Sequence, residues 1–486
     1  MLYTSGVRWN EEQQTRILGV CATGKEEFKG EKGCFWKDTR GENLEMSQEL
    51  SQRFTPGSLF RFVFPSVLMM AVMSLYTIVD GVCISKFAGS DALSATNIVY
   101  PVVNILLAVG IMLCTGGSAY VAKLLGEKKD EEANRSLSLI CSFGVAVSVI
   151  LGVGTILFLD PLCLALGADE TLIEHCRAYL GVIMAFAPAC MLQTMYQNLL
   201  VAAGRPKFGM ILTVAAGVAN AVLDVFFMGV LHMGVEGASL ATGIGQMIPA
   251  AAGSLFFFRN KKGLHFCRFS IKPAVLLKSC SNGSSEMVSQ LANAIVTVMF
   301  NGILMKMAGA DGVAAITIIL YGQFLFSAVY MGFSGGVSPI FAYQYGAGNR
   351  KEIRRLYRMC AGAILLSAAA ITAFACLTGD YIVLAFLGTD SSAYDLTIRG
   401  FFVFSFNYLF CGFNIFTSGM FTALSDGKNS ALVSFARTFG FLAAALLILP
   451  KLFGIDGVWL AVPAAEGGAF LLSLALTLLV MKKNYM

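Results

Sequence analysis

The chain has 486 residues, of which 56% are hydrophobic and only 13% are charged, and its formal net charge is +5. Its mean hydropathy of +0.70 excludes a soluble globular protein, because so few charged groups cannot cover an aqueous surface. We therefore expect a lipid bilayer to be the solvent for most of the chain.

Residues 1–54 differ in composition from everything that follows. They contain charged clusters such as EEFKGEKG and no apolar run long enough to span a membrane or build a core. We predict a disordered cytoplasmic N-terminal extension here. Met46 opens MSQELSQRFTPGSLFRF, so we hypothesise that translation starts there and that residues 1–45 come from an over-extended reading frame. N-terminal sequencing that found residues 1–45 intact would refute this.

Twelve apolar stretches follow, each long enough for a helix of about 20 residues to cross the hydrocarbon core. They are continuously apolar without period-2 alternation and contain Gly and Pro, which is typical of membrane helices and not of barrel strands. We predict an all-α membrane protein with twelve transmembrane helices, an N-terminal lobe over 55–258, a linker over 259–275 and a C-terminal lobe over 276–486. The stretches start near residues 58, 92, 136, 173, 207, 236, 277, 311, 356, 394, 429 and 457.

Basic residues are concentrated in the even-numbered connections between these helices, as in KLLGEKK, RNKKGLHFCR and NRKEIRR. The odd-numbered connections carry only Lys86, Lys306 and Lys451. Short cytoplasmic loops are enriched in Lys and Arg, so both termini are predicted to be cytoplasmic. The sequence thus predicts a multi-pass integral protein of the plasma (inner) membrane.

The chain contains an internal repeat. A shift of 220 residues places GGSAYVAKLLGEKKDEEANR, from Gly116 to Arg135, on GVSPIFAYQYGAGNRKEIRR, from Gly336 to Arg355, and four further segments match at 220 or 221. Each half holds six helices, so we expect two six-helix lobes related by a pseudo-twofold axis along the membrane normal. This architecture favours a transporter over a non-transporting receptor or scaffold, which stays open as an alternative.

Ionisable residues inside the predicted helices are few, because a charge at the bilayer centre costs about 2.5 to 3.5 kcal/mol. Two of them, Arg437 and Glu466, fall in the eleventh and twelfth helices. We interpret these two as a structural ion pair, since an unpaired charge there would be strongly destabilising.

The other two intramembrane charges, Asp80 and Asp224, are in the N-terminal lobe. Asn220 and Asp224 are four residues apart and so share a helical face, and Thr242 adds a hydroxyl from the sixth helix. Hard cations such as sodium prefer oxygen ligands, and a proton can occupy the same carboxylates. We predict a sodium or proton site at Asp80, Asn220, Asp224 and Thr242, with interhelical hydrogen bonding as the alternative. At a shift of 220 none of these groups recurs: the equivalent residues are Phe300, Gly440, Ala444 and Val462.

Candidate substrate contacts surround this cluster. Tyr76 and Met73 share the helical face of Asp80, and an aromatic ring with a flexible thioether suits amphipathic cations. Each remaining candidate, taken alone, is more often a helix contact than a ligand. These candidates are Gln193, Tyr196, Gln197 and Asn198 in the fourth helix, and Gln290 and Asn293 in the seventh.

Several segments resemble the multidrug and toxic compound extrusion (MATE) family, within the multidrug and oligosaccharidyl-lipid/polysaccharide flippase superfamily. These are YTIVDGVCISKFAG in the first helix, NAVLD in the fifth, the GEKKDEEANR and GAGNRKEIRR loops, and the two-by-six layout. The resemblance covers residues 55 to about 480. It implies xenobiotic transport, with an N-lobe cation site at Asp80, Asn220, Asp224 and Thr242. Other members use a carboxylate deep in the seventh helix, where this chain has Gln290 and Asn293.

The energy source is expected to be an ion gradient. The chain has no GxxxxGK[ST] phosphate loop, and we expect no cofactor, no nucleic-acid partner and a monomer among membrane lipids. GFSGG at 332–336 matches the GxSxG pattern of hydrolases, but it falls inside an apolar helix, so we predict no enzymatic activity. The sequence favours a cation-coupled antiporter for amphipathic compounds, and a lipid or lipid-linked oligosaccharide flippase is the main alternative.

Overall fold

The computed structural model describes residues 50–484 except 167, 169–171, 262 and 387–392. Residues 1–49, which make up most of the predicted N-terminal extension, lie outside the described residues. All regular structure within the described residues is helical. The predicted all-α class is therefore confirmed.

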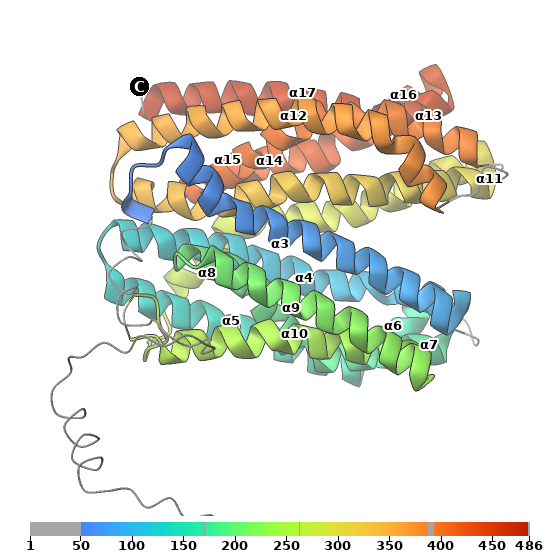
Figure 1. Cartoon of the computed structure of the whole chain (residues 1–486), viewed down its shortest axis with the longest axis horizontal. Helices are drawn as coiled ribbons and strands as arrows, with labels where there is room; N and C mark the ends of the chain where they lie inside the picture. Colours follow the sequence, from blue (N-terminus) through green and yellow to red (C-terminus); the bar gives the residue numbers. More distant parts are fainter. Residues whose placement is uncertain (1–49, 167, 169–171, 262, 387–392, 485–486) are drawn as a thin grey trace, which may run out of the picture. The chain divides into compact units, whose positions relative to one another are not determined.

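The first six predicted spans form the N-terminal half of the bundle (Figure 1). Two π-helical segments interrupt it, Ile84–Ala88 after the first helix and Val225–Val230 after the fifth-span helix. The helices are α3 (Pro56–Cys83), α4 (Gly89–Gly126), α5 (Asp130–Leu157), α6 (Leu159–Ala165), α7 (Ile173–Ala185), α8 (Ala187–Ala202), α9 (Pro206–Asp224) and α10 (Gly234–Arg259).

The C-terminal half repeats this order. Its first helix runs through two spans, with a sharp kink at Gly309, where φ is 63°. A third π-helical segment, Ala436–Gly440, interrupts the eleventh span. The helices are α11 (Pro273–Gly346), α12 (Arg350–Phe386), α13 (Tyr394–Ser405), α14 (Tyr408–Ala423), α15 (Gly427–Phe435), α16 (Phe441–Phe453) and α17 (Ile455–Asn484).

The number of spans agrees with the prediction. Among the described residues, 10 helices are long and apolar enough to cross a membrane, or up to 12 if each of two bent pairs counts as one span. The bent pairs are α7 with α8, at 57°, and α13 with α14, at 51°, and each is the fourth span of its half. The two halves therefore match span by span, including the position of the bend.

Local sequence explains where several spans begin. Thr55 caps α3, because its hydroxyl accepts a hydrogen bond from the Ser58 backbone N–H at 3.3 Å while Ser58 Oγ accepts one from Thr55 N–H at 2.8 Å. Proline, which lacks the N–H that a first turn leaves unpaired, occupies the first positions of α3, α9 and α11. Each of these prolines follows a polar connection, so the chain enters the apolar layer as a helix.

The two halves meet closely where α4 and α11 end, beside the basic connections. A Cβ added to Gly126 would overlap the carbonyl oxygen of Tyr343, and one added to Gly346 would overlap that of Lys123. These two contacts are equivalent under the 220-residue shift, so they are related by the repeat. Lys123 Nζ also lies 5.1 Å from the centre of the Tyr345 ring. We call this backbone-to-backbone contact the glycine crossing.

Candidate cation and substrate site

Asp224 is the last residue of α9 and is completely buried. Neither of its carboxylate oxygens has a hydrogen-bond partner among the described residues. A π-helical segment begins at the next residue, and such segments frequently mark functional positions. A buried carboxylate without donors is costly unless something else compensates its charge.

Asp80 approaches Asp224 from α3. The two carboxyl groups lie close enough to interact electrostatically, and Asp80 Oδ1 is also buried without a hydrogen-bond partner. Within the described residues, the chain therefore places two acidic groups side by side with no cationic side chain between them. Two adjacent carboxylates repel each other unless a proton or a metal cation is shared between them.

Asn220 and Thr242 complete one side of this cluster. Asn220 Nδ2 donates a hydrogen bond to Thr242 Oγ1 at 3.3 Å, which joins α9 to α10. The amide oxygen of Asn220, one turn before Asp224, is left without a partner and is buried. Carboxylate, amide and hydroxyl oxygens are the donors that hard cations prefer.

The residues present fit a small monovalent cation or a proton, because several oxygens are orphaned in one buried place. No group of three or more His, Cys, Asp or Glu side chains suited to a metal occurs in the part of the chain that the structure describes. The donor set is instead two carboxylates with an amide and a hydroxyl, which suits sodium better than a transition metal.

The predicted substrate contacts divide into two groups. On α3 and α8, Gln197 Nε2 lies 2.9 Å from Met73 Sδ, and the hydroxyl of Tyr76 is in hydrogen-bonding contact with Gln193. These four residues line one seam next to Asp80. Tyr196 is apart from them: its hydroxyl lies 2.8 Å from Ser254 Oγ, and its ring packs on Phe257 of α10.

The other predicted substrate contacts lie where helices of the N-terminal half meet α11. Asn198 Oδ1 faces Gly335 of α11, 3.4 Å from where a Cβ would stand. Asn293 Nδ2 lies 3.5 Å from Gln290 Oε1, and the Gln290 backbone oxygen accepts a hydrogen bond from Asn104 of α4 at 3.3 Å. Among the described residues, these side chains make no hydrogen bond to the seam of Met73 and Tyr76.

Sequence reasoning missed two neighbours of the carboxylates. Tyr179 of α7 and Cys83 of α3 both lie close enough to Asp80 and Asp224 to interact electrostatically with them. Cys83 follows Asp80 by three residues, so the helical period signals its position. Tyr179 lies beside the carboxylates because of how α7 packs, and no spacing in the sequence predicts this position.

A second polar cluster occupies the C-terminal half. Arg437 Nε lies 3.6 Å from Glu466 Oε1, and Glu466 Oε2 accepts a hydrogen bond from Asn414 Nδ2 at 2.7 Å. Glu286 of α11 is in electrostatic contact with Arg437 and in hydrogen-bonding contact with Ser418. Glu286, Arg437 and Glu466 come from the seventh, eleventh and twelfth spans. These are the repeat counterparts of the first, fifth and sixth spans, which carry Asp80, Asp224 and Thr242.

Arg437→Met is expected to destabilise the protein by about 3 to 5 kcal/mol, because it leaves Glu466 charged and buried without its cation. Thermal unfolding in detergent measures this loss. The double variant Arg437→Met/Glu466→Gln should recover part of the stability, since it removes both charges together. A wild-type melting temperature for Arg437→Met would show that the pair has no structural role.

A helical bundle with twelve spans in two repeated halves, and a buried carboxylate pair in one half, defines the class of secondary membrane transporters. The chain belongs to the MatE family, whose model matches residues 65–226 and 286–446. The two matches cover one half of the repeat each.

Relatives and solved structures agree with this assignment. The chain is 24% identical over 444 residues to the multidrug export protein MepA of Staphylococcus haemolyticus (88% of this chain, 95% of that protein). It is 25% identical over 440 residues to MepA of Staphylococcus aureus strain N315 (87% and 94%). A multidrug resistance MATE family transporter in an outward-facing conformation has a TM-score of 0.83 at 22% identity, over 90% of this chain and 98% of that one. A transporter of the same superfamily from Pyrococcus furiosus has a TM-score of 0.82 at 22% identity and the same coverage.

Proposed function

We propose that this chain is a cation-coupled antiporter that exports amphipathic, often cationic drugs and toxic organic compounds from the cytoplasm by alternating access. The observation that carries the proposal is the fully buried Asp224 carboxylate, which has no hydrogen-bond donor among the described residues and lies against Asp80. The names of the MepA relatives, which are multidrug export proteins, support the substrate class.

The coupling ion in this proposal is sodium or a proton held by Asp80, Asn220, Asp224 and Thr242. When the site is empty, its two carboxylates repel, and an ion that binds one cavity state more strongly than the other shifts the populations of the states. Asp224 directly precedes the π-helical segment Val225–Val230, and Asp80 lies one turn before Ile84–Ala88. Segments of this kind are places where helices kink. We infer that ion binding moves α3 and α9 and releases the substrate outside.

One ion can supply useful energy for export. One charge that crosses 100 mV releases about 2.3 kcal/mol. At about 1.4 kcal/mol per tenfold concentration ratio, this supports roughly a fortyfold gradient of an uncharged substrate. Exchange of one ion for one monovalent cationic substrate moves no net charge, so the concentration gradient of the ion drives it.

The substrate seam of Met73, Tyr76, Gln193 and Gln197 joins the ion site through α3. Asp80 and Tyr76 are one turn apart, so a change in the protonation or metal occupancy of Asp80 reaches the seam directly. An aromatic ring and a thioether offer polarizable contacts that tolerate many shapes of organic cation.

The flippase alternative lacks support from the charges. A pyrophosphate group needs several free cationic side chains, and Arg437 is held by Glu466 and Glu286 in the C-terminal half. We therefore retain the antiporter as the proposal.

A flux assay in vesicles tests this function. The purified chain is reconstituted with a fluorescent organic cation inside, and sodium and pH gradients are imposed separately. We expect efflux under one or both gradients and none without a gradient. No flux under any gradient would indicate a receptor or scaffold instead.

A further inference from the structure

A strap of residues 260–272, of which residue 262 lies outside the described residues, joins α10 to α11, and its residues 263–272 lie across the start of α5. His265 N–H donates a hydrogen bond to Asn134 Oδ1 at 2.9 Å, and Cys267 N–H donates one to Ser138 Oγ at 3.0 Å. The Phe266 ring packs on Phe258 with 4.9 Å between the ring centres. Among the described residues, these hydrogen bonds and this ring contact hold the connection between the two halves against the N-terminal half.

The strap must lie at the surface of the membrane. Both α10 and α11 are long and apolar enough to span the bilayer, and the strap joins the end of one to the start of the other. Its exposed side chains therefore lie at the level of the headgroup layer. On the predicted topology this is the cytoplasmic leaflet.

The outer side of the strap combines basic and apolar side chains. Arg268 and Lys272 are exposed, and between them Phe269 is 38% and Ile271 is 77% exposed. Lys272 Nζ lies 4.0 Å from Glu132 Oε1, and an exposed pair at this distance contributes little. Basic groups interleaved with exposed apolar groups are unfavourable in water, but they suit the boundary between anionic headgroups and acyl chains.

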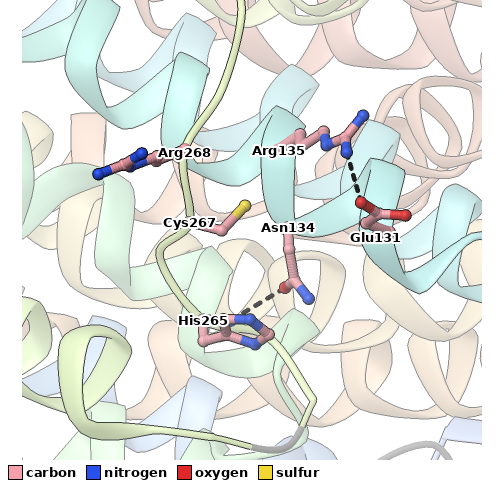
Figure 2. A pocket seen from close by; sticks show the side chains of 6 residues that line it. All are labelled: Glu131, Asn134, Arg135, His265, Cys267 and Arg268. Atoms are coloured by element: carbon pink, nitrogen blue, oxygen red, sulfur yellow. Dashed lines mark hydrogen bonds and ion pairs between the residues drawn. The ribbon is translucent and has the colours of Figure 1, made fainter.

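A polar recess lies beside this surface. A cavity of ≈ 490 Å³ opens between the strap and α5, and its lining includes Arg135, His265 and Arg268. Figure 2 shows Arg135 paired with Glu131, while the Arg268 side chain is directed away from that pair. The Arg268 side chain is exposed, so its guanidinium can reach a ligand.

We propose that the strap binds the headgroup of an anionic phospholipid. Arg268 and Lys272 hold the phosphate at the mouth of the recess, because a guanidinium and an ammonium both pair with phosphate. Phe269 and Ile271 enter the first methylenes of the acyl chains. The lipid thereby fastens the connection between the two halves to the membrane surface, independently of which ion drives transport.

The test uses the full chain in phosphatidylcholine nanodiscs into which phosphatidylglycerol is titrated, with bound lipid measured by native mass spectrometry. Arg268→Gln/Lys272→Gln should weaken phosphatidylglycerol retention about 25-fold, at about 1 kcal/mol for each basic residue near the surface. Phe269→Ser/Ile271→Ser keeps the charges and should also weaken retention, by about tenfold.

The matched control is Arg350→Gln/Lys351→Gln, which removes two exposed basic side chains at the start of α12. Wild-type retention in the control together with weak retention in the strap variants supports the proposal. Equal loss in the control would overturn it, because any basic loop would then suffice. Displacement of the lipid by millimolar inorganic phosphate would also overturn it, since the acyl contacts would then be irrelevant.

Discussion

Asp224→Asn is expected to lower gradient-driven efflux about 100-fold while the protein stays folded. The amide keeps the shape of the side chain but removes the charge that would hold the coupling ion, and losing one partner of a buried charge contact costs about 3 kcal/mol or more. Asp80→Asn should have the same effect. The double variant should be no worse than either single one, because the two carboxyl groups form one site.

Two measurements distinguish this from misfolding. Glu236→Gln removes an exposed carboxylate in the same half and should leave efflux unchanged. In the absence of sodium and at alkaline pH, where both carboxyl groups are ionised, Asp224→Asn should raise the melting temperature, because it removes one of two repelling buried charges. If both Asp variants transport at the wild-type rate, the coupling site is elsewhere.

Gly346→Ala, and equally Gly126→Ala, is expected to stop transport by preventing closure at the glycine crossing. A Cβ at either position would overlap a backbone carbonyl oxygen of the opposite helix, and backbone cannot rotate away as a side chain can. The ends of α4 and α11 must then separate. We expect efflux to fall at least tenfold.

Spin labels on Lys128→Cys and Lys351→Cys, two exposed positions in the flanking connections, report this separation. The distance between them should shift to longer values in Gly346→Ala, in a background without other reactive cysteines. Gly362→Ala is the control, since a Cβ there meets nothing within 4 Å. It should transport normally and gain a few tenths of a kcal/mol or more in helix stability. An unchanged label distance in Gly346→Ala would contradict the role of the crossing.

The spans were predictable because a helix that crosses the bilayer must be long and apolar, and both properties can be read directly from the sequence. The starts expected near 173, 311 and 394 coincide with Ile173, Asp311 and Tyr394. The bends were not predicted, because bending depends on packing. At Phe186, between α7 and α8, the ring fills the space beside Gly243 of α10, a contact between distant segments that no local pattern encodes.

The site was predictable in part, for a similar reason. The spacing of Asn220 and Asp224 is local, so the helical period gives their shared face, and the rarity of buried charges singles out Asp80. Aligning the two halves at a shift of 220 residues does not reveal the cluster of Glu286, Arg437 and Glu466. Arg437 maps to Gly217, two turns from Asp224, so the fifth span and its counterpart carry their charged side chains at different depths. The ion pair of Arg437 and Glu466 was predicted from the sequence, and the packing of the helices adds Glu286 to it.

The glycine crossing also bears on how this molecule arose. Gly126 rests on the carbonyl of Tyr343 as Gly346 rests on that of Lys123, so the same patch is used twice about one axis. This is the isologous interface of a symmetric dimer. A six-helix ancestor that paired with its own copy would have made this contact with a single glycine. Fusion of the two copies would then have allowed each half to mutate alone, so that one could keep a pair of acids while the other acquired an arginine.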